Sequence, residues 1–317
     1  MAPGSTIAFA RRIGPALLGR VTLLLAVLAW GGALSPFLDG LNHFAPFWLA
    51  FAVAASLACL ALNARGWAAY CAIAALAQAT IIAPEFLRPT SAPVAAGERT
   101  IRVVWLNTWL GSRPSGDVLH YLAEADADFL LVSELHDEGQ PQFQRLRALY
   151  PTVIRCEGGH DCNTFIFARR RALSQQTRTG LRASMGEFDI DGAPLRLIAA
   201  HVARPNPPQR QQQEFTALRQ LIGADTSNVI LAGDFNSTPW SFGLRRFDHG
   251  ANLQRYTRAL PTWPAQAWTR FYLPAIAPFL PIDHAYSGAN WRLVSLQRGR
   301  KTSSDHYPIE ATFTYVE

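Results

Sequence analysis

Three short segments in the second half of the chain gather side chains that can hold a water molecule, a metal ion or a phosphate. In the first, Leu231 to Pro239, an apolar run turns at Gly233 and presents Asp234 and Asn236 two residues apart. Alternate side chains of an extended chain face the same way, so this pair offers an acceptor and a donor to one water or phosphate oxygen. The other two segments are Ile282 to His284, which contains Asp283, and Ser303 to Pro308, which contains Asp305 and His306.

Apolar runs of strand length are expected to position these side chains. Four of them each lead to a polar residue: Ile101 to Leu106 before Asn107, Phe129 to Ser133 before Glu134, Leu195 to Ala200 before His201, and Val229 to Gly233 before Asp234. Such runs are typical of buried strands, and here they would deliver polar side chains to one rim. Any one of these polar residues alone is more often a turn or a cap, whereas four together favour a site.

Helical patterns alternate with these runs and further strands follow them. Helices are expected over Asp117 to Glu124, Gln142 to Leu149 and Gln209 to Leu221, and more strands over Thr152 to Arg155, Thr164 to Ala168, Ile282 to Ser287, Trp291 to Gln297 and Ile309 to Tyr315. This order predicts an α/β sandwich, with strands stacked as two sheets and helices outside.

The motifs resemble a known superfamily. Gly-Asp-Phe-Asn at 233–236 and Ser-Asp-His-Tyr-Pro at 304–308, in this order and after Glu134, are similar to those of the endonuclease/exonuclease/phosphatase superfamily, which includes DNase I, abasic-site nucleases, neutral sphingomyelinases and inositol-polyphosphate 5-phosphatases. The resemblance covers about Arg99 to Glu317. It implies a four-layer α/β sandwich, with two mainly antiparallel sheets, and a metal-dependent attack of water on a phosphate ester.

The resemblance also implies a role for each site residue. Glu134 would be the main metal ligand, supported by Asn107 and Asp305, and oxygen ligands without thiolates suit Mg²⁺, or Mn²⁺ in its place. His306 would position or deprotonate the attacking water while Asp283 accepts from its other ring nitrogen. The remaining roles fall to Asp234 and Asn236, which would hold the nucleophile and the phosphoryl oxygens, and to His201, which would stabilise or protonate the leaving group.

Two positions depart from the abasic-site nucleases. Trp109 stands where those enzymes usually carry an acidic residue, and His201 stands where they carry Tyr. The pattern is more similar to the DNase I and sphingomyelinase branches. The ordinary alternatives are a turn cap for Asp305 and His306, and a surface acid for Asp283 and Glu134. We interpret His136, His160 and His284 as incidental.

The N-terminal part is too apolar for a soluble protein. Overall 49% of the residues are hydrophobic and 16% are charged, and uncharged stretches long enough to cross a hydrocarbon core run over Val21 to Leu38, Phe44 to Leu62 and Gly66 to Ala83. We therefore expect a membrane anchor with three transmembrane helices over residues 1–88, a linker over 89–98 and a catalytic domain over 99–317. A cleaved signal peptide is the alternative for the first stretch, and a buried amphipathic helix for the third.

Arginine positions predict the orientation of the anchor. Arg11, Arg12 and Arg20 precede the first stretch and Arg65 separates the second from the third, whereas the Asp39 to His43 connection has none. The positive-inside rule then places the N-terminus in the cytoplasm. Three crossings would deliver the catalytic domain to the extracytoplasmic side of a bacterial inner membrane.

The cysteines divide by environment. Cys59 and Cys71 lie in apolar stretches, whereas Cys156 and Cys162 bracket a short loop that also holds His160. An oxidising compartment would permit a disulfide between the second pair. A Cys/His metal site is the alternative, although it lacks a second pair of cysteines.

Composition narrows the substrate without fixing it. Residues after Glu98 include 24 basic and 20 acidic side chains, a modest net charge of +4, and neither a GxxxxGK phosphate loop nor a Gly-x-Ser-x-Gly elbow occurs. A tethered domain meets lipid head groups at high effective concentration, so a lipid-borne or other envelope phosphoester is favoured, and the aromatic segment Trp268 to Leu280 would be either a lip for acyl chains or core.

Two other classes of function remain open. An extracytoplasmic nuclease would need a basic groove, for which the candidates are Arg245 with Arg246, or Arg298, Arg300 and Lys301. A non-catalytic membrane sensor would be expected to have lost the site residues. No protein partner is inferred, and the sequence leaves monoester and diester substrates open.

Overall fold

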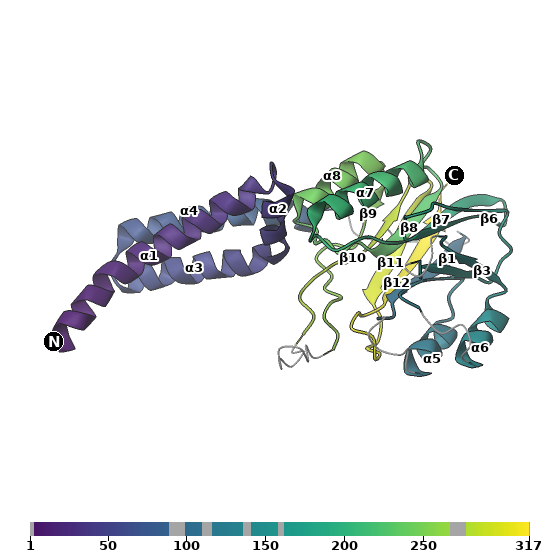
Figure 1. Cartoon of the computed structure of the whole chain (residues 1–317), viewed down its shortest axis with the longest axis horizontal. Coiled ribbons are helices and arrows are strands. Elements are labelled where there is room, and N and C mark those ends of the chain that lie inside the picture. The colour runs from purple at the N-terminus through teal and green to yellow at the C-terminus, as the bar shows by residue number, and fades with distance from the viewer. Residues whose placement is uncertain are drawn as a thin grey trace. The chain divides into compact units, whose positions relative to one another are not determined.

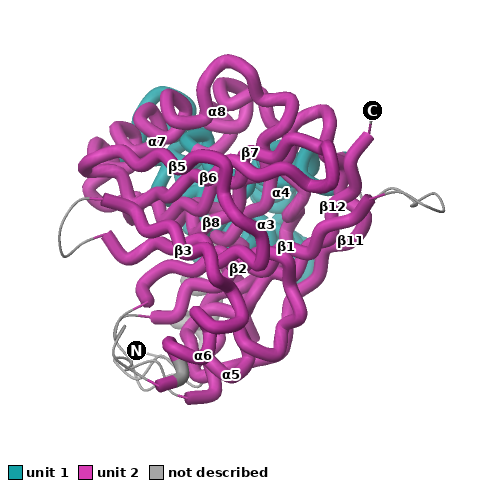
Figure 2. Tube along the Cα trace, turned by 90° about the vertical axis from the view of Figure 1, so that its right-hand side faces the viewer, with its two compact units in different colours: residues 1–87, 239–243 teal, residues 88–238, 244–317 magenta. Residues whose placement is uncertain are grey.

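The computed structural model describes residues 3–88, 99–109, 116–135, 141–157, 162–266 and 277–316. Two compact units are present: unit 1 comprises residues 1–87 and 239–243, and unit 2 comprises residues 88–238 and 244–317 (Figure 2). The expected linker over 89–98 lies outside the described residues.

Unit 1 is helical, with α1 (Pro3–Gly31), α2 (Pro36–Asp39), the 3₁₀ helix η1 (Gly40–Phe44), α3 (Ala45–Ala61) and α4 (Arg65–Phe86) (Figure 1). By length and composition, three described segments can cross a membrane: Ile13–Gly31, Pro36–Ala61 and Arg65–Phe86, with mean hydropathies of 1.8, 2.0 and 1.5. The second and third expected stretches therefore correspond to α3 and α4.

The predicted extent of the first span, Val21 to Leu38, is wrong. Helix α1 ends at Gly31, and a Cβ on the next residue, Gly32, would lie 2.5 Å from Nδ2 of Asn42. The chain turns at this close approach. Because the residues after the turn are also uncharged, hydropathy alone could not separate them from the helix.

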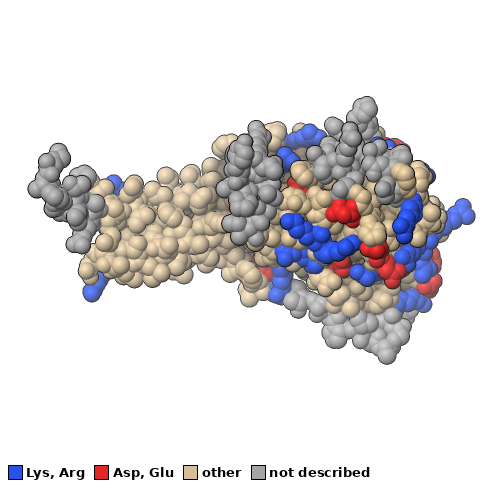
Figure 3. Space-filling model, turned by 90° about the horizontal axis from the view of Figure 1, so that it is seen from below, with Lys and Arg blue, Asp and Glu red and all other residues tan. Residues whose placement is uncertain are grey.

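The interior of unit 1 is lined by small side chains. Buried residues include Ala26, Ala52, Ala55, Cys59, Ala68, Cys71 and Ala74, whereas Leu17, Leu24, Val27, Leu57 and Leu76 are 58–68% exposed. Small residues between helices and large apolar residues outside are typical of helices that pack in lipid. In Figure 3 the visible face of these helices is almost free of charged side chains.

Residues 239–243 belong to unit 1 although they follow the Asp234 motif in the chain. The two carboxylate oxygens of Asp39 accept the backbone N–H groups of Phe242 and Gly243, at 2.8 and 2.7 Å. The indole N–H of Trp240 donates to the carbonyl oxygen of His43 at 3.2 Å. The two bonds to Asp39 satisfy the first N–H groups of helix α8 (Phe242–Ala251), which would otherwise lack acceptors.

Unit 2 contains two six-stranded sheets. The first has the order β11-β12-β1-β2-β4-β3 and the second β5-β6-β7-β8-β10-β9. Each sheet is antiparallel apart from one parallel pair, β1 with β2 and β7 with β8. The strands are β1 (Thr100–Asn107), β2 (Phe129–Ser133), β3 (Thr152–Arg155), β4 (Phe165–Ala168), β5 (Ser174–Thr177), β6 (Ala183–Ile190), β7 (Ala193–His201), β8 (Val229–Asp234), β9 (Gln254–Arg255), β10 (Asp283–Ser287), β11 (Trp291–Arg298) and β12 (Ile309–Tyr315).

Helices cover the outer faces of the two sheets. Helices α5 (Gly116–Glu124) and α6 (Pro141–Leu149) share a buried cluster with β1, β2 and β4, and α7 (Pro208–Ile222) and α8 share another with β7 and β8. The predicted four-layer α/β sandwich is confirmed. The sequence did not predict β5, β6, β9 or α8, because β6 has charged residues and Gly186, and α8 has two glycines.

The core between the sheets is built from residues at alternate positions of the strands. Its rows are Ile101, Val103 and Trp105 on β1, Leu195, Leu197 and Ala199 on β7, Ile230 and Ala232 on β8, and Ala285 on β10. Two residues further along these strands come Asn107, His201 and Asp234, while Asp283 lies two residues before Ala285. Because side chains alternate along a strand, these four polar residues extend the core rows to one end of the space between the sheets.

Candidate active site

Strand register aligns the site residues at that end. Asn107 lies opposite Ser133, the residue before Glu134, in the first sheet, and Asp234 pairs with both His201 and Asp283 in the second. The two sheets thus each bring their polar strand ends to the same edge of the sandwich.

The side chain of Asn107 joins the two sheets. Its Nδ2 donates to Oε1 of Glu134 and to Oδ2 of Asp234, both at 3.0 Å. Glu134 itself has a φ of 56°, and Asn236 has a φ of 47°. The left-handed conformation costs a non-glycine residue about 1–2 kcal/mol, and such residues cluster at functional sites. No sequence pattern indicated these conformations.

His306 and Asp283 form a buried pair. Nδ1 of His306 lies 2.8 Å from Oδ2 of Asp283, and its Nε2 lies 3.8 Å from Oδ2 of Asp234 and 3.9 Å from Oδ1 of Asp305. Burial alone would lower the pKa of His306, but the surrounding carboxylates outweigh burial and raise the pKa to about 10. At neutral pH the imidazole is therefore positively charged.

Burial shifts the pKa values of Asp234 and His201 in opposite directions, and each shift favours the neutral form of the group. Burial, followed by repulsion from Asp283, raises the pKa of Asp234 to about 7. Burial also lowers the pKa of His201 well below its usual value, with Arg182 and His306 acting in the same direction. Nε2 of His201 lies 3.5 Å from Oε1 of Glu134 and 3.9 Å from Oδ2 of Asp234. His201 is thus a neutral group beside the carboxylates.

Asn236 is held by two backbone contacts. Its N–H donates to Oδ1 of Asp234 at 2.8 Å, and its Nδ2 donates to the carbonyl oxygen of Val202 at 3.0 Å. The structure thus brings Asn107, Glu134, His201, Asp234, Asp283, Asp305 and His306 into one network of contacts, and ties Asn236 to it through Asp234.

The donor set fits a hard divalent cation. Oδ1 of Asp305 is buried and has no hydrogen-bond partner among the residues that the structure describes, and burial raises the pKa of this carboxyl. A buried acceptor of this kind is costly unless a partner completes it. Oxygen atoms of Glu134, Asp305 and Asn107 are ligands that Mg²⁺ prefers.

A different set of potential metal ligands lies closer together. Among the described acids, histidines and cysteines, ligand atoms of Asp234, Asp283 and His306 lie within 4.8 Å of one another. Both oxygens of Asp283 already accept hydrogen bonds, from Trp105 at one and from Thr262 and His306 at the other. Among the three ligands that the resemblance implies, Oδ1 of Asn107 also accepts a hydrogen bond, from the N–H of Trp109 at 3.0 Å, whereas Oδ1 of Asp305 is a buried acceptor without a partner among the described residues. Asp305 is therefore the best-supported candidate ligand, and Glu134 and Asn107 remain candidates beside it.

Several residues to which the sequence gave no role hold the site residues in place. Ser304 donates through Oγ to the carbonyl oxygen of Asn107 at 2.6 Å and accepts the N–H of His306 at 3.0 Å. Trp263 donates its indole N–H to Oδ2 of Asp305 at 3.1 Å. Trp105 could have been found from the sequence, because it lies two residues before Asn107 and so on the same face of the strand. Thr262 and Trp263 lie in a loop, where no sequence pattern indicates a role.

His284, which we interpreted as incidental, holds the Asp234 loop. Its Nε2 lies 2.8 Å from the carbonyl oxygen of Ser237 and its Nδ1 lies 2.8 Å from Oγ1 of Thr257. A carbonyl can only accept, so Nε2 carries the proton. Burial lowers the pKa of His284 well below its usual value, which agrees with a neutral ring.

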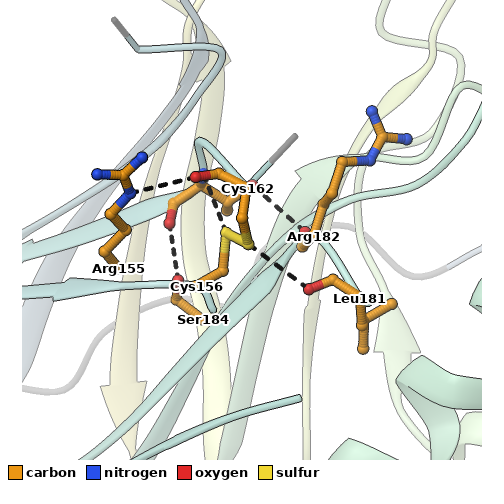
Figure 4. Close-up of a disulfide and its surroundings, with 7 residues drawn as sticks. Arg155, Cys156, Cys162, Leu181, Arg182 and Ser184 are labelled. Carbon is orange, nitrogen blue, oxygen red and sulfur yellow. Dashed lines mark hydrogen bonds between the residues drawn. A yellow bond between two sulfur atoms is a disulfide. The ribbon is translucent and has the colours of Figure 1, made fainter. Parts of the chain in front are cut away.

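The disulfide alternative for Cys156 and Cys162 is present in the structure, with Cα atoms 5.6 Å apart (Figure 4). Next to it, Oγ1 of Thr164 donates to the carbonyl oxygen of Arg182 at 3.3 Å. The same carbonyl accepts the N–H of His201 at 2.8 Å. Thr164, two residues after Cys162, therefore contacts the same backbone carbonyl as His201, while His160 lies outside the described residues.

Most of the aromatic segment Trp268 to Leu280 also lies outside the described residues, which resume at Ala277. Phe279 is half-buried, and its ring centroid lies 6.1 Å from that of Trp263. This end of the segment is thus next to the residue that binds Asp305.

Solved structures with the same fold are known. D. rerio TDP2 complexed with single strand DNA product has a TM-score of 0.55 at 17% identity, covering 68% of this chain and 99% of that chain. The human Nocturnin catalytic domain with bound sulfate has a TM-score of 0.52 at 16% identity, covering 74% and 99%. An endonuclease/exonuclease/phosphatase family protein from Bacteroides thetaiotaomicron has a TM-score of 0.52 at 13% identity, covering 69% and 99%.

These likenesses establish the fold. No curated protein sequence matches the chain. The family model described as Endonuclease/Exonuclease/phosphatase family matches residues 104–306, which is more than half of the chain and includes the site from Asn107 to His306. The chain therefore belongs to the endonuclease/exonuclease/phosphatase family and is a hydrolase that cleaves phosphate esters.

Proposed function

We propose that the protein is a divalent-metal-dependent phosphoesterase that directs water at a lipid-borne or other envelope phosphate ester. The observation that carries the proposal is the meeting of oxygen ligands with the buried Asp283 and His306 pair at one end of the sandwich. Separate parts of the chain supply these groups, and a purely structural role would not require them to meet.

Glu134, Asn107 and Asp305 would hold the cation, which we expect to be Mg²⁺ or Mn²⁺. When bound, the cation supplies Lewis-acid stabilisation of negative charge on the phosphoryl oxygens. The buried Oδ1 of Asp305, which accepts no hydrogen bond from any described residue, supports this assignment.

The protein's own groups would handle the proton of the attacking water. Oδ2 of Asp234 faces Nε2 of His306 at 3.8 Å, so one water or phosphoryl oxygen can contact both groups. The sequence-based expectation gave the proton to His306. A charged His306 has no room for another proton, so we assign proton acceptance to Asp234 and phosphoryl-oxygen binding to His306.

Asn236 and His201 would complete the contacts to substrate. Asn236, fixed beside Asp234 by its backbone N–H, would help to hold the nucleophile and the phosphoryl oxygens. Because burial keeps His201 neutral, we expect it to stabilise the leaving group by donating a hydrogen bond.

The helical unit supports a lipid-borne substrate. A domain joined to segments that can cross a membrane meets phospholipid head groups at high effective concentration. Part of the candidate basic groove is also engaged elsewhere, because Arg298 lies over the Tyr307 ring at 4.4 Å and Arg300 pairs with Glu124 at 3.2 Å. The alternative is a nuclease, which the fold shared with DNA-bound TDP2 supports.

The deciding experiment measures Mg²⁺-dependent hydrolysis by the full chain in detergent or liposomes. Its substrates are phospholipid vesicles, single-stranded and plasmid DNA, and bis(p-nitrophenyl) phosphate, with Glu134→Gln as the inactive control. We expect the highest kcat/KM on the vesicles. A higher kcat/KM on DNA, with affinity that falls steeply as salt is added, would replace the lipid proposal with the nuclease. Hydrolysis of none of them, with Mg²⁺ or Mn²⁺, would contradict the metal-dependent phosphoesterase.

The aromatic segment gives a second test of the substrate. If it contacts acyl chains, Phe279→Ser should reduce hydrolysis of vesicles while sparing bis(p-nitrophenyl) phosphate, because only the lipid uses the apolar surface. Equal losses on both substrates would indicate that Phe279 is a packing residue. Matching circular dichroism spectra and thermal melts are required before the activities are compared.

We further propose that the protein resides in the bacterial inner membrane with its catalytic domain on the extracytoplasmic side. The distribution of arginines around the apolar segments supports this orientation. Alkaline phosphatase fused after Val94 should be active, and a reporter that works only in the cytoplasm should be silent there. The reverse pattern would place the catalytic domain in the cytoplasm.

A further inference from the structure

The carboxylate of Asp283 receives three donors. The indole N–H of Trp105 donates to Oδ1 at 2.7 Å. At Oδ2 the hydroxyl of Thr262 also donates, beside Nδ1 of His306 at 2.8 Å. With both oxygens engaged as acceptors, the carboxylate has one orientation available, and that orientation fixes Nδ1 as the ring nitrogen of His306 that it binds.

Trp105 reaches this carboxylate across the core. It lies on β1 of the first sheet, is 1% exposed and packs in the cluster between the sheets, whereas Asp283 begins β10 of the second sheet. A buried indole N–H requires an acceptor. The acceptor here is a site carboxylate, although a backbone carbonyl is the commoner partner of side-chain donors in protein interiors.

We propose that Trp105 is a positioning residue for the Asp283 and His306 pair. By holding Oδ1, it keeps Oδ2 directed at Nδ1 of His306, and so keeps Nε2 of His306 toward Asp234 and Asp305. The proposal rests on the phosphoesterase function proposed above. It adds a residue that acts through Asp283 and is itself neither a proposed metal ligand nor a proposed catalytic group.

The matched test replaces two tryptophans. Trp105→Phe keeps a ring in the core and removes the donor. Trp291→Phe makes the same change at a control position. Trp291 is fully buried in the same cluster and donates its indole N–H to the carbonyl oxygen of Pro194 at 3.1 Å. It pairs with Tyr315, at the opposite end of β12 from Ile309, which pairs with Trp105.

The expected difference lies in kcat on bis(p-nitrophenyl) phosphate with Mg²⁺. Loss of a partner that orients a site residue typically costs about 10- to 100-fold, so Trp105→Phe should lower kcat by that factor while KM stays within about twofold. Trp291→Phe should retain the parental kcat. Both variants are assayed below their melting transitions, so that any loss of stability does not enter the rate.

A double-variant cycle separates positioning from packing. In an Asp283→Ala background, Trp105→Phe should change kcat by less than about twofold, because the group on which it acts is absent. The same factor lost in both backgrounds, or a parental kcat in Trp105→Phe alone, overturns the proposal. A parent without activity on any phosphate ester instead overturns the proposed function.

A readout independent of activity completes the test. The indole N–H of Trp105 should exchange slowly with solvent deuterium in the parent, and markedly faster in Asp283→Ala than the indole N–H of Trp291 in the same sample. Equal protection of both protons in Asp283→Ala would show that Asp283 does not hold the Trp105 indole.

Discussion

The two units bury opposite kinds of side chain. In unit 1 the interior is lined by alanines and cysteines, while leucines such as Leu24 and Leu76 are exposed. In unit 2 the large apolar side chains, Trp105 and Phe129 among them, fill the core, and Figure 3 shows positive and negative side chains interspersed on its surface. Unit 1 thus has the pattern of helices that pack closely in lipid, whereas unit 2 has that of a domain stabilised by burial of apolar area from water.

Buried polar groups follow the same division. Unit 1 buries Asp39 and Asn42, which satisfy backbone groups of α8 and α1. At the candidate site unit 2 buries Asp234, Asp283 and His306 together, so that two carboxyl groups face each other beside one imidazole. Polar burial in the first case satisfies backbone groups, whereas in the second it shifts pKa values, as is common at functional sites.

The largest expected effect comes from a single atom exchange at that candidate site. Glu134→Gln should reduce kcat/KM by about 10²- to 10³-fold, because a neutral amide is a poorer metal ligand than a carboxylate. Thermal stability without metal should change little, and the rise in melting temperature on adding Mg²⁺ should disappear. The control Glu124→Gln, at an exposed position of the same unit, should behave as the parent. Parental activity in Glu134→Gln would contradict the metal assignment.

The next prediction tests whether the exposed leucines of unit 1 face lipid. Leu24 is 58% exposed in the middle of Ile13–Gly31, and Leu173 of unit 2 is 71% exposed. A charge at the centre of a membrane helix costs about 2.5–3.5 kcal/mol, so Leu24→Asp should reduce the membrane-integrated fraction by on the order of 10²-fold. Leu173→Asp should leave it unchanged. The fraction that resists carbonate extraction measures both, and equal behaviour would show that Leu24 does not face lipid.

The accuracy with which the sequence predicts the bounds of helices and strands depends on the sequence pattern that marks their ends. Strands β2, β3 and β12 have their predicted bounds: β2 is a continuous apolar run that ends at a polar residue, and β12 alternates apolar and polar residues. The segments that could cross a membrane are visible as uncharged runs. Where such a run crosses a turn, as at Gly32, hydropathy cannot locate the end of the helix.

The site shows the same limit. Its acids and histidines stand in motifs that a sequence displays directly. The left-handed conformation of Glu134 and the bond from His284 to Ser237 depend on how the chain turns after a strand. The bond from Trp105 to Asp283 depends on the distance between the two sheets. That distance is set by close packing of many strands, as at Gly186, where a Cβ would lie 2.5 Å from Ile154. No local sequence pattern encodes this distance.

A smaller effect distinguishes the cysteines of the two units. Cys156 and Cys162, six positions apart, are bonded, whereas Cys59 and Cys71 are free and buried. Closing so short a loop stabilises by about 2 kcal/mol, which corresponds to a melting temperature about 4–8 °C higher. Changing both Cys156 and Cys162 to Ser should remove this increment and make the melt insensitive to reductant, while Cys71→Ala should retain the sensitivity. A parental melt that ignores reductant would contradict the stabilising role.

The most specific effect is on the shape of the pH profile, and it tests the titratable groups of the candidate site in unit 2. If Asp234 accepts the proton, it must be ionised, so kcat/KM should fall about tenfold per pH unit as the pH drops below its pKa of about 7. If His306 binds the phosphoryl oxygens as a cation, kcat/KM should fall again as the pH rises above its pKa of about 10. Bound metal would move the acidic limb toward lower pH, because a nearby cation favours the carboxylate. At saturating Mg²⁺, His306→Ala should therefore lose most of kcat and the basic limb but keep the acidic limb, whereas Asp234→Asn should lose the acidic limb. Disappearance of the acidic limb in His306→Ala would indicate that His306 accepts the proton of the attacking water, as the sequence alone predicts.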